Sequence, residues 1–223
     1  MELRVDQHYW RERSARALNR ASQLKQRPWR ITADTGLQVA GITNVFHFER
    51  RIQEFAAGYL VDRATKIVEI GYGLGFSAKI FLTADLASYT LVEANAGIAR
   101  RAFRRGIPPS SIQTISWQSW LQRSKSLKCD GIYYDCFPAL TNFRYQATQL
   151  DRYLSHFFSA LTQKNTFTGT VVFITLQQGS YIPKIGGGVH VTHIKDFNLP
   201  ASTRPRLPSC RRSSIWAAAL SAR

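Results

Sequence analysis

The feature that most constrains the fold is a glycine-rich turn at residues 71–75. It follows an apolar, strand-like run at 66–70 and opens a helix-like segment at 76–86. Glycine lets the backbone turn sharply there and lets a ligand approach the main chain closely. A buried strand, a glycine turn and a helix in this order form the first unit of a nucleotide-binding α/β sheet.

The rest of the chain repeats this order of strand and helix. The alternation predicts a mostly parallel, doubly wound α/β sheet of Rossmann-like type, with helices on both faces. Two later strand-like runs, 188–197 and 213–222, could form a C-terminal antiparallel pair, and residues 198–212 read as a loop. We expect the other strands within 66–73, 88–95, 111–117, 129–137 and 169–177, and helices within 76–86, 96–106, 117–126 and 149–163.

The spacing of the glycines distinguishes two classes of cofactor. Dinucleotide enzymes normally show GxGxxG, whose third glycine permits close helix packing and places the pyrophosphate at the helix N-terminus. Here the spacing is GxGxG after Glu69, and Glu93 lies eighteen residues past Gly75, at the tip of the next strand. An acid in that position accepts hydrogen bonds from a ribose diol. The E-x-G-x-G-x-G form is typical of methyltransferases, so we expect the cofactor to be S-adenosylmethionine.

Residues after the third strand extend the predicted cofactor site. Trp117 could stack on the adenine, with Gln118 or Ser119 near the adenine edge. Alternatively, Trp117 and Trp120 are simply buried aromatic residues. The predicted cofactor-binding residues are Glu69, Gly71, Tyr72, Gly73, Gly75, Glu93, Ala94, Trp117, Gln118 and Asp135.

Asp135 ends the fourth strand of the expected sheet. In open α/β sheets that edge faces the ligand crevice, which would place Asp135 beside the methyl donor. The alternative is that its carboxylate caps the turn formed with residues 136–138.

In this region the chain resembles guanidinoacetate methyltransferase and its relatives, which include arginine N-methyltransferases of the same branch. The most specific similarity is Asp-Gly-Ile-Tyr-Tyr-Asp-Cys-Phe-Pro at residues 130–138. Segments 33–49, 93–97 and 116–118 and the glycine turn are also similar, so the resemblance covers roughly residues 33–180.

The resemblance implies that Glu49 and Asp135 are the catalytic residues and hold a guanidinium group between them. A guanidinium has a pKa of about 12.5–13.8, so carboxylates can bind it through charge-assisted hydrogen bonds, orient one nitrogen and take up its proton. The chain departs from the family at Phe48-Glu49-Arg50-Arg51, where the two arginines could neutralise Glu49. The family's long fifth helix is also missing after residue 178, so an arginine-like molecule or an arginine in a peptide would fit a more open pocket.

The N-terminal part of the chain is predicted to lie outside the methyltransferase domain. Residues 6–27 form an amphipathic, basic helical pattern stopped by Pro28, and 31–43 are mixed and turn-rich. A further helix is expected from about Glu49 to Val61. We therefore expect a basic helical extension at 1–44 and the methyltransferase domain at 45–223. The first helix could cover one side of the domain or serve as an arm for nucleic acid or another partner.

The net charge of +16, from 30 basic and 14 acidic residues, limits the choice of partners. Such a field attracts anions, so an acidic partner or an RNA substrate is an alternative to a small-molecule or peptide substrate. Strand four carries no Asn-Pro-Pro-Tyr-type base-methylating motif, which disfavours nucleic acid. A catalytically inactive binding module and a homodimer are further alternatives.

The cysteines and the chain start bear on the compartment. Cys129, Cys136 and Cys210 fit neither a disulfide framework nor a zinc site, so we expect free thiols and no metal. The first residues contain acids and no apolar core of a signal peptide, and no run of about 18 apolar residues could span a membrane. A cytoplasmic protein is expected.

Overall fold

The computed structural model describes residues 28–33, 36–39, 42–135, 146–163, 167–177, 189, 191–198 and 212–220. The predicted helix at 6–27, the residues between 198 and 212, and both Cys136 and Cys210 lie outside these ranges. Among the described helices, none combines the length and the apolar composition that crossing a membrane requires.

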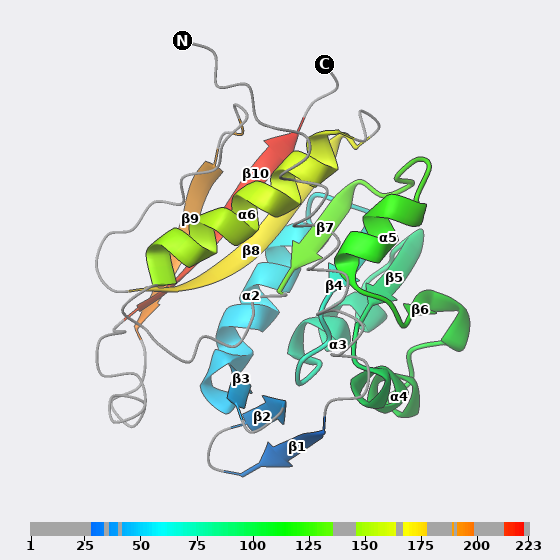
Figure 1. Cartoon of the computed structure of the whole chain (residues 1–223), viewed down its shortest axis with the longest axis vertical. Helices are drawn as coiled ribbons and strands as arrows, with labels where there is room; N and C mark the ends of the chain where they lie inside the picture. The colour runs from blue at the N-terminus through cyan, green and yellow to red at the C-terminus, as the bar shows by residue number, and fades with distance from the viewer. Residues whose placement is uncertain are drawn as a thin grey trace, which may run out of the picture.

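A seven-stranded sheet forms the centre of the molecule (Figure 1). The spatial order is β6 (Ile112–Gln113), β5 (Ser88–Val92), β4 (Lys66–Ile70), β7 (Gly131–Tyr134), β8 (Gly169–Gln177), β10 (Arg212–Leu220) and β9 (Val191–Asn198). The first five of these strands are parallel to one another, and β10 runs antiparallel to both of its neighbours, so β10 and β9 form the C-terminal antiparallel pair that the sequence predicts. Because β4 lies between β5 and β7, the chain winds outward in both directions from the carboxyl end of β4.

Helices cover both faces of this sheet. The side chains of its central strands alternate between the two faces, and both faces carry apolar residues that must be buried. The helices are α2 (Arg50–Val61), α3 (Phe76–Thr83), α4 (Ala96–Arg104), α5 (Trp117–Arg123) and α6 (Gln146–Thr162), with short 3-10 turns η1 (His47–Glu49) and η2 (Pro109–Ser111). On β7, Ile132 and Tyr134 pack into the core shared with α5 and α6, while Tyr133 packs into the core shared with α2 and α3. The predicted doubly wound arrangement is therefore confirmed.

A second, smaller sheet precedes the large one. Strands β1 (Trp29–Thr32), β2 (Gly36–Val39) and β3 (Ile42–Phe46) form an antiparallel sheet where the sequence indicated a mixed, turn-rich segment. The predicted boundary between residues 44 and 45 thus falls inside β3, and the described part of the predicted helical extension is β-structure. The strands are four or five residues long, too short for a clear alternating pattern.

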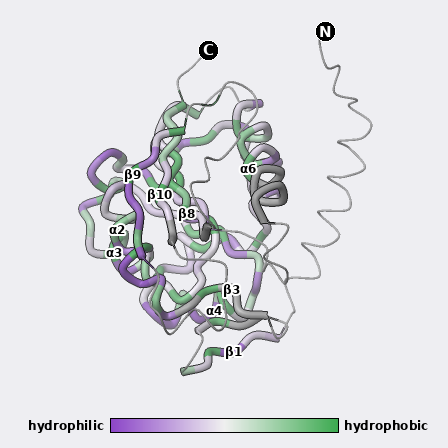
Figure 2. Tube along the Cα trace, turned by 90° about the vertical axis from the view of Figure 1, so that its left-hand side faces the viewer, coloured by the Kyte–Doolittle hydropathy of each residue, from purple (hydrophilic) through white to green (hydrophobic). Residues whose placement is uncertain are grey.

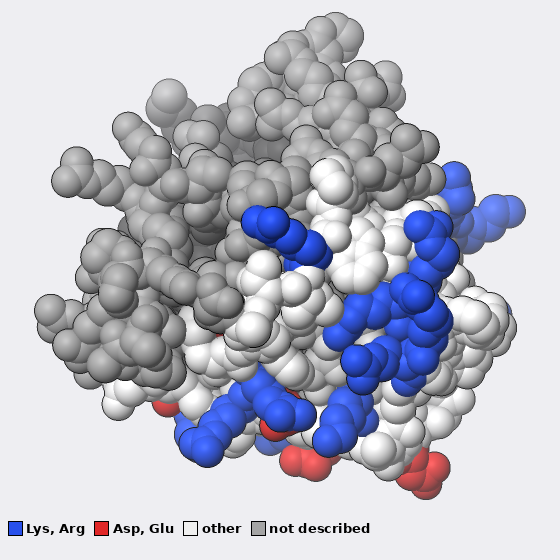
Figure 3. Space-filling model, turned by 90° about the horizontal axis from the view of Figure 1, so that it is seen from below, with Lys and Arg blue, Asp and Glu red and all other residues white. Residues whose placement is uncertain are grey.

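The small sheet lies at the end of the molecule where α4 lies, which is the carboxyl edge of the parallel strands (Figures 1 and 2). Val45 of β3 contacts the glycine turn, because a Cβ added at Gly73 would lie 2.8 Å from Val45 Cγ2. Trp29 of β1 lies against α4 at Gly97 in the same way. Figure 3 looks onto this end from below and shows Lys and Arg side chains gathered there.

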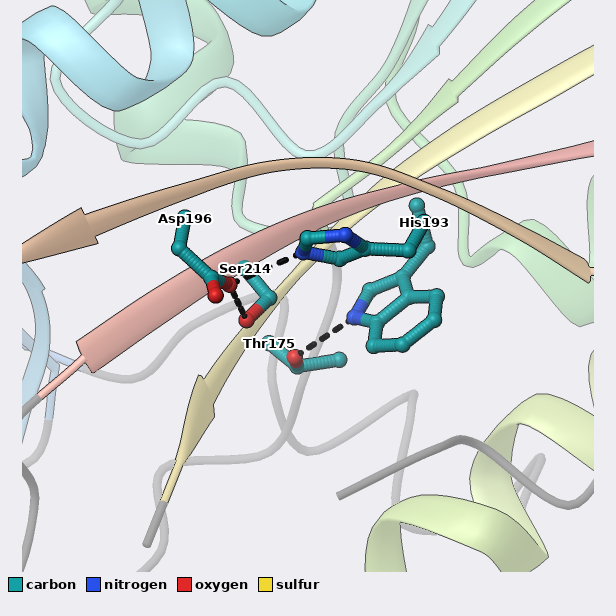
Figure 4. Close-up of polar contacts among 5 residues, drawn as sticks. Thr175, His193, Asp196 and Ser214 are labelled. Carbon is teal, nitrogen blue, oxygen red and sulfur yellow. Dashed lines mark hydrogen bonds and ion pairs between the residues drawn. The ribbon is translucent and has the colours of Figure 1, made fainter. Parts of the chain in front are cut away.

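Polar contacts join the three C-terminal strands of the large sheet (Figure 4). Asp196 Oδ1 accepts hydrogen bonds from His193 Nε2 at 2.9 Å and from Ser214 Oγ at 2.5 Å, and Trp216 Nε1 donates to Thr175 Oγ1 at 3.0 Å. Both His193 and Ser214 bind the aspartate instead of one another, so the group lacks the serine–histidine bond of a nucleophilic triad. Its position beside the irregular register at Ile215/Trp216 indicates a structural role.

Candidate active site

The glycine turn between β4 and α3 is shaped by left-handed backbone conformations. The φ angles of Gly71, Gly73 and Gly75 are 91°, 52° and 80°. At Gly75 two features exclude a side chain. The positive φ disfavours one, and an added Cβ would lie 2.5 Å from the ring of Tyr72. The Gly71 N–H donates to the Val92 carbonyl at 2.9 Å, which fixes the turn against the end of β5.

Arg101 of α4 braces the same turn from outside. Its Nη1 donates to the carbonyl oxygens of Leu74 at 3.2 Å and Gly73 at 3.4 Å, and its guanidinium lies 5.5 Å from the centre of the Tyr72 ring. Burial lowers the pKa of Arg101 and raises that of Tyr72. The sequence did not single out Arg101, because its partners lie 27 and 28 residues away in the chain.

Glu93 follows β5 and joins the ends of two strands. Its carboxylate accepts the backbone N–H groups of Tyr72 at 3.0 Å and Asn95 at 2.7 Å. Burial raises its pKa, and hydrogen bonds from the backbone of Tyr72, Asn95 and Ala94 partly offset this rise. Asn95 in turn caps α4 by accepting from the N–H groups of Gly97 and Ile98. Glu93 and the half-buried Ala94 therefore lie beside the glycine turn, where the sequence places a ribose contact that stays a prediction.

Glu69 has a more internal position than the sequence indicated. Its side chain is fully buried, and its two oxygens accept hydrogen bonds from Ser77 of α3 and Tyr89 of β5. Burial raises its pKa to about 8, so the group is mostly protonated at neutral pH. It links β4, β5 and α3 beneath the turn, and its predicted contact with a cofactor stays a prediction.

The two predicted catalytic carboxylates are brought together by a residue that the sequence did not single out. Gln53 of α2 is completely buried, and its Nε2 donates to Asp135 Oδ2 at 3.0 Å and to Glu49 Oε2 at 3.3 Å. Glu49 is buried at the start of α2, and Asp135 directly follows β7. Arg50, which could have neutralised Glu49, pairs instead with Glu54 at 3.1 Å.

Burial and neighbouring charge control the protonation of this cluster. Burial raises the pKa of Asp135 to about 6. Tyr133 is fully buried, and burial together with the charges of Asp135, Glu69 and Glu49 raises its pKa well above the ordinary value. Four carboxylates, those of Glu49, Glu69, Glu93 and Asp135, are thus concentrated at one edge of a strongly basic protein. Grouped acids of this kind, with the pKa values of Glu69, Glu93 and Asp135 raised, are typical of functional sites.

The third predicted part of the site lies at the start of α5. Ser116 caps this helix by accepting the Ser119 N–H, and Gln118 is half-buried in its first turn. Trp117 is only 4% exposed and meets the rings of Tyr134, His156 and Phe157 edge to face. In this conformation it belongs to the core, which favours the interpretation as a buried aromatic; stacking on adenine stays a prediction.

The described residues contain no candidate metal site. Within the residues that the structure describes, no three His, Cys, Asp or Glu side chains are grouped so that they could hold an ion. Cys129 is a free thiol, as expected, and burial raises its pKa to about 12.

Comparison with known proteins identifies the class of fold. No protein family profile and no curated protein sequence matches the chain. Among solved structures, the candidate methyltransferase yhhF from Escherichia coli matches with a TM-score of 0.51 and 9% identity, over 79% of this chain and 89% of its own. A candidate methyltransferase in complex with S-adenosylhomocysteine matches with a TM-score of 0.52 and 11% identity, over 85% of this chain and 57% of its own. A candidate S-adenosylmethionine-dependent methyltransferase from Streptococcus mutans matches with a TM-score of 0.50 and 11% identity, over 80% and 54%.

The chain therefore has the Rossmann-like fold of class I methyltransferases, in agreement with its strand order. These comparisons distinguish no branch within the class. The resemblance to guanidinoacetate and arginine methyltransferases rests on the sequence segments alone.

Proposed function

We propose that this protein is an S-adenosylmethionine-dependent N-methyltransferase that acts on a guanidino or amino nitrogen of a small molecule or an arginine-containing peptide. The observation that supports it most directly is the pair of carboxylates, Glu49 and Asp135, held by the single amide of Gln53. The pair is at the edge of the sheet where the glycine turn and Glu93 also lie.

The residues of this edge fit the methyl donor. S-adenosylmethionine, when bound, supplies a methyl group activated by a sulfonium sulfur. Glu93 would accept hydrogen bonds from its ribose hydroxyls, since the two oxygens of a carboxylate together accept about four hydrogen bonds. Because Gly71, Gly73 and Gly75 carry no side chains, the rest of the molecule could lie close to the main chain of this turn. A solved structure of the same fold in complex with S-adenosylhomocysteine supports this assignment.

The carboxylate pair suits a cationic acceptor. With a pKa of about 6, Asp135 is mostly ionised at neutral pH and still basic enough to take a proton from a bound nitrogen. Gln53 keeps the two carboxylates in place without neutralising them, because an amide donates hydrogen bonds but carries no charge. Its own Oε1 is buried and has no hydrogen-bond partner among the described residues. The result is a group of acceptors that matches the several N–H donors of a guanidinium.

Donor binding is tested first, by calorimetric titration with S-adenosylhomocysteine at low and moderate salt. We expect micromolar affinity that barely changes with salt, because Glu93 and the backbone bind a ligand without phosphates. Absence of heat at both salt concentrations would exclude the enzyme function while leaving the fold unaffected.

The acceptor is tested by transfer of a labelled methyl group to arginine, guanidinoacetate and an arginine peptide, with citrulline as the matched control. Citrulline has nearly the shape of arginine but carries a neutral urea, so a carboxylate pair should reject it. We expect Glu49→Gln to raise KM for arginine compounds and to leave the affinity for S-adenosylhomocysteine unchanged. Equal methylation of citrulline and arginine would overturn the proposed recognition of a cation.

A further inference from the structure

Basic residues on the outer side of α4 lie outside the proposed active site and are not used by it. No Asp or Glu occurs between Glu93 and Asp130, a stretch that includes α4. Four of its seven basic residues belong to α4 or directly follow it, namely Arg100, Arg101, Arg104 and Arg105. Figure 3, seen from the carboxyl edge of the sheet, shows Lys and Arg side chains grouped over this end of the molecule.

The inner side of α4 is already committed to the fold. Ala99 and Ala102 are buried in the core, and Arg101 is bonded to the glycine turn. The helix is also capped by Asn95, whose backbone N–H is bonded to Glu93. The orientation of α4 relative to the proposed site is therefore determined by several independent contacts.

The outer side of α4 presents two arginines and one phenylalanine. Arg100, Phe103 and Arg104 have the i, i+3, i+4 spacing that places side chains together on one helix face. Both arginines are exposed, and Phe103 is 54% exposed, the largest exposed fraction among the large apolar residues described. Within the described part of the chain, Arg100 and Arg104 form no ion pair.

We propose that this outer face of α4, formed by Arg100, Phe103 and Arg104, binds single-stranded nucleic acid. The forked donors of arginine match phosphate oxygens. An exposed aromatic ring between them gives an unpaired base a surface for stacking, and stacking of this kind accompanies charge in sites for single strands. A duplex would not use the phenylalanine, because its bases are already stacked on one another.

Two other anionic partners fit this face less well. A membrane surface would require several apolar side chains on the outside of the helix, whereas the other apolar residues of α4 point inward. An acidic polypeptide would pair with the arginines but would have no use for the ring. The combination of charge and aromatic surface thus selects nucleic acid.

Binding is measured by the fluorescence anisotropy of a labelled single-stranded RNA of about 12 nucleotides, within the usual footprint of roughly 4–16. The full-length protein is used without methyl donor, at several salt concentrations around about 0.1 M, where the screening length is about 10 Å. Because no donor is present, the outcome is independent of the proposed methyltransferase activity.

Arg100→Ala/Arg104→Ala should weaken binding at least about tenfold and reduce the slope of log K against log salt by about 1.4, because each phosphate contact contributes about 0.7. Phe103→Ala should weaken binding roughly tenfold with an unchanged slope, because stacking does not involve counterions. The matched control, Lys66→Ala/Arg123→Ala, removes the same charge from exposed residues near the opposite edge of the sheet and should change affinity by less than about twofold.

Thermal melting of each variant shows that the fold is retained. The proposal is overturned if the Arg100/Arg104 variant binds like the control variant. It is also overturned if Phe103→Ala has no effect, or if polyglutamate competes as well as unlabelled RNA, since the face would then be a general anion surface.

Discussion

Acidic and basic residues meet at the carboxyl edge of the sheet in opposite environments. Glu49, Glu69 and Glu93 are buried, Asp135 is half-buried, and all accept hydrogen bonds from neighbouring groups. The arginines on the outer face of α4 are exposed to water. Burial changes the protonation of a group, so the acids can do proton chemistry, whereas exposed arginines contribute mainly attraction over distance.

The largest expected effect comes from removing the carboxylate of Asp135, the proposed proton acceptor. Asp135→Asn should reduce kcat about a thousandfold, because a positioned acid–base group contributes about 10²–10⁴. The affinity for S-adenosylhomocysteine should not change. Kinetics with an arginine acceptor and calorimetry on the same protein check both statements. Asp62→Asn, at an exposed acid after α2, is the matched control, and retention of most activity in Asp135→Asn would contradict the guanidinium site.

The next effect concerns the acid that joins β4 to β5. Glu93→Ala should weaken S-adenosylhomocysteine binding by about ten- to a hundredfold, as expected for hydrogen bonds to a charged acceptor worth about 1.5–3 kcal/mol. It should also lower the melting temperature, since the N–H groups of Tyr72 and Asn95 lose their acceptor. Calorimetry and thermal melts separate the two effects. Unchanged affinity would place the ribose elsewhere.

A smaller effect is the dependence of stability on pH that the buried carboxyl group of Glu69 should cause. Because burial raises the pKa of Glu69 from 4.5 to about 8, the folded state holds a proton that the unfolded state releases between these values. Stability should therefore fall as the pH rises through this window, by at most about 5 kcal/mol from this group. Asp135 titrates similarly only up to about pH 6. Glu69→Gln should thus flatten the decline between about pH 6 and pH 8 in urea unfolding. A parallel curve for the variant would show that Glu69 is already ionised.

The smallest effect concerns Cys129, where burial changes the pKa of a group outside the carboxyl edge of the sheet. Burial raises the pKa of the Cys129 thiol to about 12, so little thiolate is present at neutral pH. Iodoacetamide should modify Cys129 very slowly in the native protein and rapidly in urea, as measured by mass spectrometry of the peptide. Fast native labelling would mean that this segment opens readily.

The sequence predicted those elements whose own residues carry a strong pattern. The apolar runs at β4, β7 and β8 and the glycine turn between β4 and α3 are local features, and they led to the correct prediction of a mostly parallel, doubly wound sheet. The three short strands at 29–46 were missed, because four or five residues give too little periodicity. The sequence also singled out Glu49, Glu93 and Asp135, which the structure places at one edge of the sheet, while their roles stay predictions.

The remaining site residues depend on tertiary contacts that no local pattern encodes. Gln53 binds Asp135 across 82 positions of the chain, and in sequence it is an ordinary polar residue of an amphipathic helix. Arg101 resembles its exposed neighbours on α4 until the glycine turn is placed beside it. The burial of Glu69 and Trp117 also follows from packing between separate elements.

The contacts of Gly73 and Gly97 with the small N-terminal sheet affect how this protein could be recombined with others. A β-carbon at Gly97 would lie 2.0 Å from Trp29 Nε1, and one at Gly73 would lie 2.8 Å from Val45 Cγ2. Each glycine thus leaves room for an apolar side chain more than 25 positions earlier in the chain. A chimera that joins residues 28–46 of one protein to the remainder of another inherits both mismatches unless the donor segment and the two glycines are exchanged together. The smallest interchangeable module at this end therefore extends from the first strand of the small sheet through α4.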